Sequence, residues 1–147
     1  MHVLNSKERK QLLAALKEQF GFSGDLPALL QNQEGKVYAT TADISVIDHL
    51  RVDMVGLCIG SFEKDGFSLT IEGSQLIGPL AKKNVVDLGK DQVAAWFRGE
   101  DLQGDPETHA YVILRSGKDY LGSGKASGGK IFNRVPKVRR LNALLAQ

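Results

Sequence analysis

The sequence predicts an α+β protein built from two small units, of which the second is rich in β-strands. Apolar residues recur at helical spacing within the first twenty residues. Much of the remaining chain consists of short apolar or β-branched runs separated by Gly and polar turn residues, which is typical of strands. With 147 residues, 42% hydrophobic and 24% charged, the chain has the composition of a globular protein and can bury a core.

The first unit opens with an amphipathic helix. Asn5 is a good N-cap residue, and Glu8 three positions later completes a capping-box pair. Gly21 is a natural end for this helix. The face expected to turn inward carries apolar side chains at helical spacing, namely Leu12, Leu13, Leu16 and Phe20.

The rest of the first unit is expected to mix strands with short helical segments. The segments predicted are a strand over residues 35–41, a short helix over 42–50, a buried strand over 53–62 and its return strand over 67–71. The apolar pair Leu29-Leu30 indicates no particular element. Ser74 is expected to cap a last helical segment that Pro79 distorts. We place the domain boundary just after it, which gives units of residues 1–82 and 83–147.

The second unit is predicted to contain one helix and several strands. A strand over residues 84–88 precedes a helix that begins at residue 90 or 91, continues through Phe97 and is stopped by Gly99. A polar loop over 100–108 leads to a hairpin with strand 111–114 and a turn over 116–119. The basic segment 134–140 should then form a charged edge strand.

The return strand of the hairpin carries Gly122 and Gly124, which lie on one face of a strand because they are two positions apart. Glycine lowers the stability of a strand. Two of them on one face therefore predict that another backbone or a ligand approaches closely there.

Charge is distributed unevenly along the chain, although the net charge is only +2. Residues 108–147 hold eight Lys or Arg against one acid, Asp119, a net charge of +7, whereas the first 107 residues carry −5. This asymmetry indicates an acidic partner for the C-terminal part, most commonly nucleic acid. The alternative is that edge-strand lysines only prevent aggregation. The apparent lack of compensating acids favours the nucleic-acid interpretation.

No catalytic or metal-binding constellation stands out. Cys58 lies alone in an apolar segment, and the three histidines, His2, His49 and His109, do not have the spacing of zinc ligands. The glycines do not follow a strand and open a helix, so they form no dinucleotide or phosphate loop. We expect no cofactor, no metal and no membrane span. A single cysteine and the lack of a secretory signal pattern favour a cytoplasmic protein.

Three segments of the second unit resemble the PUA domain, an RNA-binding module named after pseudouridine synthases and archaeosine transglycosylases. They are Phe97-Arg98-Gly99-Glu100-Asp101-Leu102, Tyr111-Val112-Ile113-Leu114 and Leu121-Gly122-Ser123-Gly124-Lys125-Ala126. Residues 55–62, 67–69 and 76–82 look like the pre-PUA domain of the Nip-seven family of ribosome biogenesis factors. The C-terminal part of Sun-family RNA cytosine methyltransferases looks similar. Asp105-Pro106-Glu107-Thr108-His109 replaces the Pro-Gly-Val-like segment common in PUA domains.

The resemblance implies an α/β pre-PUA domain followed by a β-rich PUA pseudo-barrel, with RNA against the helix, its following loop and the glycine-bearing hairpin. On that analogy Arg98 and Gly99 line the RNA groove, and Gly122 and Gly124 let the RNA backbone come close. Basic side chains would hold phosphates, namely Lys125, Lys130, Arg134, Lys137, Arg139 and Arg140. With few exposed aromatics expected, base stacking should contribute little.

We therefore predict a non-catalytic protein that binds rRNA or tRNA in ribosome biogenesis or RNA modification. Both halves of the chain are accounted for by the resemblance, which leaves no segment for a methyltransferase core. Two alternatives stay open: an RNA-targeting accessory subunit of a separately encoded RNA methyltransferase, and a protein-interaction scaffold. The expected partners besides RNA are an RNA-modifying enzyme or pre-ribosomal proteins.

Overall fold

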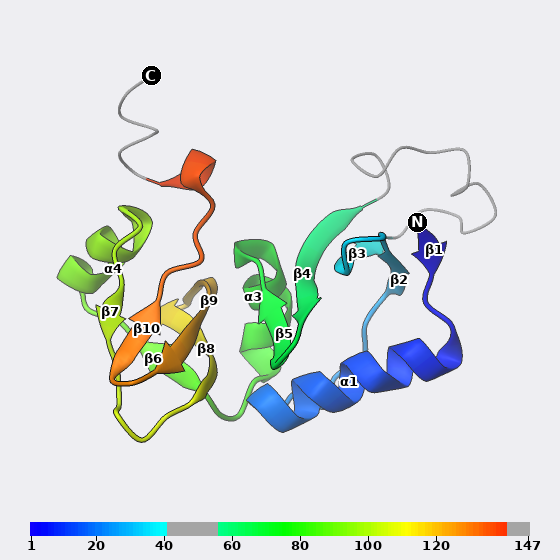
Figure 1. Cartoon of the computed structure of the whole chain (residues 1–147), viewed down its shortest axis with the longest axis horizontal. Helices are drawn as coiled ribbons and strands as arrows, with labels where there is room; N and C mark the ends of the chain where they lie inside the picture. The colour runs from blue at the N-terminus through cyan, green and yellow to red at the C-terminus, as the bar shows by residue number, and fades with distance from the viewer. Residues whose placement is uncertain (41–55, 141–147) are drawn as a thin grey trace.

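The computed structural model describes residues 1–40 and 56–140, and it confirms the predicted α+β class (Figure 1). Helices accompany two five-stranded sheets, one in each half of the chain. The strand order is β1-β2-β3-β4-β5 in the first sheet and β6-β8-β9-β10-β7 in the second. Among the described residues, no helix is long and apolar enough to span a bilayer.

Helix α1 (Ser6–Phe20) forms as the sequence predicts, with both hydrogen bonds of the Asn5–Glu8 capping box present and Gly21 in the left-handed region at φ 65°. Leu12, Leu16 and Phe20 are buried, whereas Leu13 is only partly buried. This apolar face packs in one core with the first sheet, which therefore has a helix on one side.

The first sheet is antiparallel throughout. Its strands are β1 (His2–Val3), β2 (Ala28–Gln31), β3 (Lys36–Thr40), β4 (Leu57–Glu63) and β5 (Gly66–Leu69). The pair Leu29-Leu30 thus belongs to a strand. The helix predicted over 42–50 and the start of the strand predicted over 53–62 lie outside the described residues.

Helix α3 (Ile71–Ile77) begins earlier than predicted, because Thr70 and not Ser74 is its N-cap. The Thr70 hydroxyl accepts a hydrogen bond from the Gly73 N–H at 2.9 Å. Ser74 is fully buried within the helix, and its hydroxyl accepts from the Gly122 N–H at 2.8 Å. Pro79 lies in the 3-10 turn η2 (Gly78–Leu80) that follows the helix.

The second sheet curls around a core that contains Trp96. Its strands are β6 (Val85–Asp87), β7 (Leu102–Gln103), β8 (Ala110–Ser116), β9 (Asp119–Ser127) and β10 (Lys130–Phe132). Trp96 comes from α4 (Lys90–Phe97), is fully buried, and donates its indole N–H to the Leu121 carbonyl at 2.9 Å. Strand β7, which pairs with β10, lies within the segment predicted to be a polar loop.

The basic segment 134–140 is not the charged edge strand that the sequence predicts. It is irregular until the 3-10 turn η3 (Lys137–Arg139). Pro136 has no N–H for a sheet ladder. Before it, the Asn133 side chain donates to the Trp96 and Glu100 carbonyls and accepts from the Val135 N–H, which fixes an irregular path.

The two sheets pack directly against each other. Tyr111 and Ile113 of β8 belong to the same buried cluster as α1 and the first sheet. Gly78 also lies against the Tyr120 ring of β9. The PUA-like half is therefore braced by the N-terminal half, and the boundary between residues 82 and 83 stays a prediction.

Candidate nucleic-acid interface

The two glycines of the hairpin are buried, and what approaches them closely is protein. A Cβ built on Gly122, whose φ is +104°, would lie 3.4 Å from Ile71 of α3. A Cβ on Gly124 would lie 2.6 Å from Ile131 and 3.0 Å from Trp96. The predicted close approach is real, but its partners are α3, α4 and β10. We therefore leave both glycines out of the candidate RNA surface.

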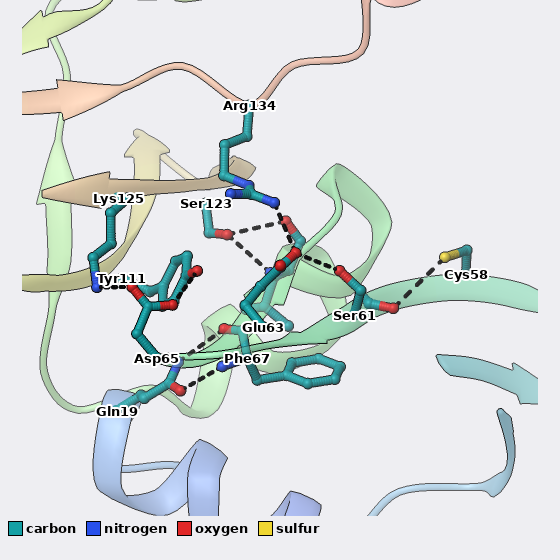
Figure 2. Close-up of polar contacts among 12 residues, drawn as sticks. Gln19, Cys58, Ser61, Glu63, Asp65, Phe67, Tyr111, Ser123, Lys125 and Arg134 are labelled. Carbon is teal, nitrogen blue, oxygen red and sulfur yellow. Dashed lines mark hydrogen bonds and ion pairs between the residues drawn. The ribbon is translucent and has the colours of Figure 1, made fainter. Parts of the chain in front are cut away.

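Three of the predicted phosphate-binding cations form ion pairs with acids of the N-terminal half. Lys125 Nζ lies 2.7 Å from Asp65 Oδ2, and Arg134 Nη2 lies 2.9 Å from Glu63 Oε1 (Figure 2). Arg139 pairs with Glu72. The basic tail thus does have compensating acids, contrary to the sequence interpretation. They lie 60 or more residues away in the chain and only the fold brings them together.

Lys125 belongs to a polar cluster centred on Tyr111, whose hydroxyl donates to Asp65 Oδ1 at 2.8 Å. Lys125 Nζ lies 4.7 Å from the centroid of the Tyr111 ring, within cation–π range. Hydrogen bonds from Lys125 and then Tyr111 lower the pKa of Asp65. Burial, followed by the bond to Asp65, raises the pKa of Tyr111 to about 12. These contacts join the two halves and indicate a structural role for Lys125.

Arg98 and Gly99 lie at the C-terminal end of α4, as predicted. Arg98 is exposed, and its Nε donates to Glu100 Oε2 at 2.5 Å. Gly99 has φ +88°, and a Cβ there would lie 2.5 Å from Arg140 Nε. Arg140 therefore lies directly across Gly99, and its Nε also donates to the Val135 carbonyl at 3.2 Å. A glycine at this position lets the guanidinium lie against the backbone.

Lys130, Lys137 and Arg140 form no ion pair with any acid in residues 1–40 and 56–140. Lys130 lies on β10 and Lys137 in η3, both exposed. The Asn133 bonds tie the end of β10 to the α4–β7 loop. We use the name free-cation surface for these three unpaired cations together with the end of α4, where Arg98 pairs only with Glu100 of the following loop; its residues are Arg98, Gly99, Lys130, Lys137 and Arg140.

Sequence reasoning missed Phe132, which is 44% exposed at the end of β10. It lies opposite Lys125 of β9 and two residues after Lys130, on the outer face of the strand, since Ile131 between them is buried. An exposed aromatic ring beside cations is a stacking platform for a base. The alternation Lys130-Ile131-Phe132 contained this signal.

The described residues contain no group of three or more His, Cys, Asp or Glu placed to hold a metal ion. Cys58 is half-buried on β4, and burial raises the pKa of its thiol. A raised pKa disfavours the reactive thiolate. The exposed residues of the site, such as Lys130, Lys137 and Phe132, offer cationic and aromatic contacts.

Residues 83–141 match the family model described as the methyltransferase RsmF PUA domain. These residues carry a PUA domain. The curled second sheet is its pseudo-barrel, and the predicted resemblance to the C-terminal part of Sun-family methyltransferases is confirmed. The pre-PUA assignment of the first unit stays a prediction.

The curated relatives that this chain matches bear the name ribosomal RNA small subunit methyltransferase F. The Aeromonas hydrophila protein is 28% identical over 137 residues, which are 91% of this chain and 28% of the relative. The Vibrio cholerae protein is 25% identical over 93 residues, which are 63% of this chain and 20% of the relative. The alignments thus span between a fifth and somewhat over a quarter of these relatives' length.

Proposed function

We propose that this protein binds RNA through the free-cation surface of its PUA domain and acts in the modification of ribosomal RNA. The observation that carries this proposal is that Lys130, Lys137 and Arg140 all belong to the PUA domain and have no acidic partner among the described residues. The relatives' name, which specifies methyltransferases of small-subunit ribosomal RNA, supports rRNA as the class of ligand.

The arrangement suits a phosphate backbone better than a base edge. Lysine and arginine in reach of a strand neutralise phosphates without reading sequence. Arg140 is held against Gly99 by its bond to the Val135 carbonyl, so its guanidinium loses little freedom when it binds. Phe132 adds a surface for one unpaired base. Shape and charge therefore dominate, with a single stacking contact.

We propose that the chain contributes binding and positioning and performs no catalysis by itself. In this scheme residues 1–82 form the pre-PUA unit that braces the PUA domain, and the protein works in the cytoplasm. A second candidate function is an RNA-targeting subunit of a separately encoded methyltransferase. Its support is the relatives' name, which specifies methyltransferases of small-subunit ribosomal RNA.

The deciding experiment measures RNA affinity against salt for an rRNA fragment and for a single strand. We compare the wild type with the combined Lys130→Ala, Lys137→Ala, Arg140→Ala variant. The variant should bind RNA more weakly. The slope of its log affinity against log salt concentration (the log–log salt slope) should be flatter than that of the wild type by roughly 2 to 3. The matched control is Lys7→Ala, Lys10→Ala, Lys17→Ala on exposed positions of α1, which removes the same charge.

Equal losses in the two triple variants would mean that only net charge matters and would reject the free-cation surface. For the second candidate, the protein is added to a methyltransferase acting on rRNA. Stimulation that the free-cation variant loses supports a targeting subunit. A wild type that binds neither RNA contradicts the proposed function altogether.

A further inference from the structure

A pocket of about 300 Å³ lies between the C-terminal tail and the N-terminal sheet. Its wall on one side is the tail, with Arg134, Pro136 and Arg139. The opposite wall is formed by the first sheet and the start of α3, with Lys36, Cys58, Gly60, Ser61, Ser68, Leu69, Thr70 and Glu72. The pocket therefore exists only because the tail folds back over the other half of the chain.

The lining is cationic. Lys36, Arg134 and Arg139 face one carboxylate, Glu72, which gives the lining a net charge of +2. Outside the lining, Glu63 pairs with Arg134 and Glu34 lies 3.8 Å from Lys36, so each of the three cations has one carboxylate close to it. One cation of the first sheet and two of the tail line the same hollow, and the N–H donors that their carboxylate partners leave free favour an anionic ligand.

The cations keep donors available for such a ligand. Arg134 meets Glu63 through Nη2, and Arg139 meets Glu72 through Nη1. A guanidinium has five N–H donors, so each carboxylate orients its arginine while leaving donors on the other side. Lys36 Nζ is 3.8 Å from Glu34 Oε2, too far for a hydrogen bond, and it remains 52% exposed.

We propose that this pocket binds a phosphate of the RNA strand that the free-cation surface holds, with Lys36, Arg134 and Arg139 as its ligands. The proposal rests on the proposed function and extends it to the N-terminal half. Arg139 stands between Lys137 and Arg140 of that surface in the η3 segment. A strand leaving the surface along the tail therefore meets the pocket next, and arginine donors match phosphate oxygens in pairs.

Lys36→Ala tests the proposal, because Lys36 is exposed, lies outside the PUA domain, and makes only the 3.8 Å contact with Glu34 through its side chain. We expect weaker binding of a single-stranded RNA oligonucleotide and a log–log salt slope that is flatter by about 1. Lys10→Ala on α1 is the matched control and should leave the slope unchanged. Thermal melting of both variants checks that they remain folded.

A second readout is the amide NMR signals of Ser61, Ser68 and Thr70 during titration with the oligonucleotide, and separately with inorganic phosphate. Shifts with RNA that Lys36→Ala abolishes support the proposal. Shifts with inorganic phosphate alone overturn it in favour of a free-anion site.

The failure of this inference is distinguishable from failure of the proposed function. If the free-cation variant loses RNA affinity while Lys36→Ala binds like Lys10→Ala and the pocket amides stay still, the pocket proposal is wrong and the RNA-binding function stands. If the wild type does not bind RNA, both are rejected.

Discussion

Ser123 of β9 and Leu69 of β5 are joined by two hydrogen bonds, although 54 residues separate them. The Ser123 hydroxyl accepts from the Leu69 N–H at 2.9 Å and donates to the Leu69 carbonyl at 3.0 Å. Strand β5 is an edge of the first sheet, so its outer N–H and C=O groups need partners. One buried hydroxyl of the PUA sheet satisfies both groups and fixes how the two sheets meet.

Ser123→Ala should therefore destabilise the whole chain. The substitution leaves a buried N–H and a buried C=O of Leu69 without partners, and each unmet group costs about 1–3 kcal/mol. We expect the free energy of unfolding in urea to fall by at least about 2 kcal/mol. Ser127→Ala, at the less buried end of the same strand, is the control and should change it by under about 0.5 kcal/mol. Similar losses for both would show that the Leu69 bonds contribute little.

Gly124→Ala separates the two interpretations of the hairpin glycines. The added methyl group would lie 2.6 Å from Ile131 and 3.0 Å from the Phe132 carbonyl, so we expect a loss of about 1–3 kcal/mol in stability. Gly128→Ala is the control: a Cβ there meets nothing within 4 Å, and only its φ of +60° is strained. Urea midpoints and RNA affinities of the folded variants decide whether Gly124 serves packing or RNA contact. A Gly124→Ala protein of normal stability but weakened RNA binding would restore the glycines to the RNA surface.

The fold was predictable where local rules govern it. The Asn5–Glu8 capping box, the spacing of Leu12 and Leu16, and the turn at Gly117 act over a few residues, and each element formed as expected. Strand β7 was missed because a two-residue strand carries almost no periodic signal. The tail was mistaken for a strand because the bonds of the Asn133 side chain depend on backbone carbonyls of another segment.

The candidate site was less predictable than the fold. Lys130 is exposed and Arg140 partly exposed, as is usual for charged side chains, and their assignment as phosphate-binding residues stays a prediction. That Lys125 meets Asp65 could not be anticipated, because ion pairs across the two sheets depend on how the sheets dock. Counting charge along the sequence therefore overstated the positive charge available to a ligand.

The Tyr111–Asp65–Lys125 cluster should give the protein a two-sided pH dependence. The pKa of Asp65 is lowered in the folded state. The ionised Asp65 carboxylate therefore adds to the free energy of unfolding above the ordinary Asp pKa of about 3.9, and this stabilisation is lost as the pH falls below that value. The pKa of Tyr111 is raised to about 12. The protonated Tyr111 hydroxyl therefore adds to the free energy of unfolding below the ordinary Tyr pKa of about 10, and this stabilisation is lost as the pH rises toward 12.

Unfolding free energies of wild type, Asp65→Asn and Tyr111→Phe against pH check this prediction. The difference in free energy of unfolding between wild type and Asp65→Asn should vanish as the pH falls below about 4. The difference in free energy of unfolding between wild type and Tyr111→Phe should vanish as the pH rises from about 10 to 12. Gaps that stay constant with pH would show that neither ionisation is coupled to folding.

Phe132→Ala should weaken binding of single-stranded RNA without changing its salt dependence. Stacking of a base on an aromatic ring contributes about 1–3 kcal/mol by alanine substitution, which corresponds to about a 5- to 150-fold loss of affinity. Because Phe132 carries no charge, the log–log salt slope should equal that of the wild type. Phe132→Trp keeps a stacking surface and should retain affinity, whereas Phe132→Leu keeps only apolar bulk.

These variants distinguish stacking from general hydrophobic contact. Retained affinity in Phe132→Trp with a loss in Phe132→Leu supports a base on the ring. Equal affinity in Phe132→Leu and wild type would show that the exposed side chain offers bulk alone, and unchanged affinity in Phe132→Ala would remove it from the interface. Since Phe132 is 44% exposed and its neighbour Ile131 carries the core contact, all three substitutions should leave the urea midpoint near that of the wild type.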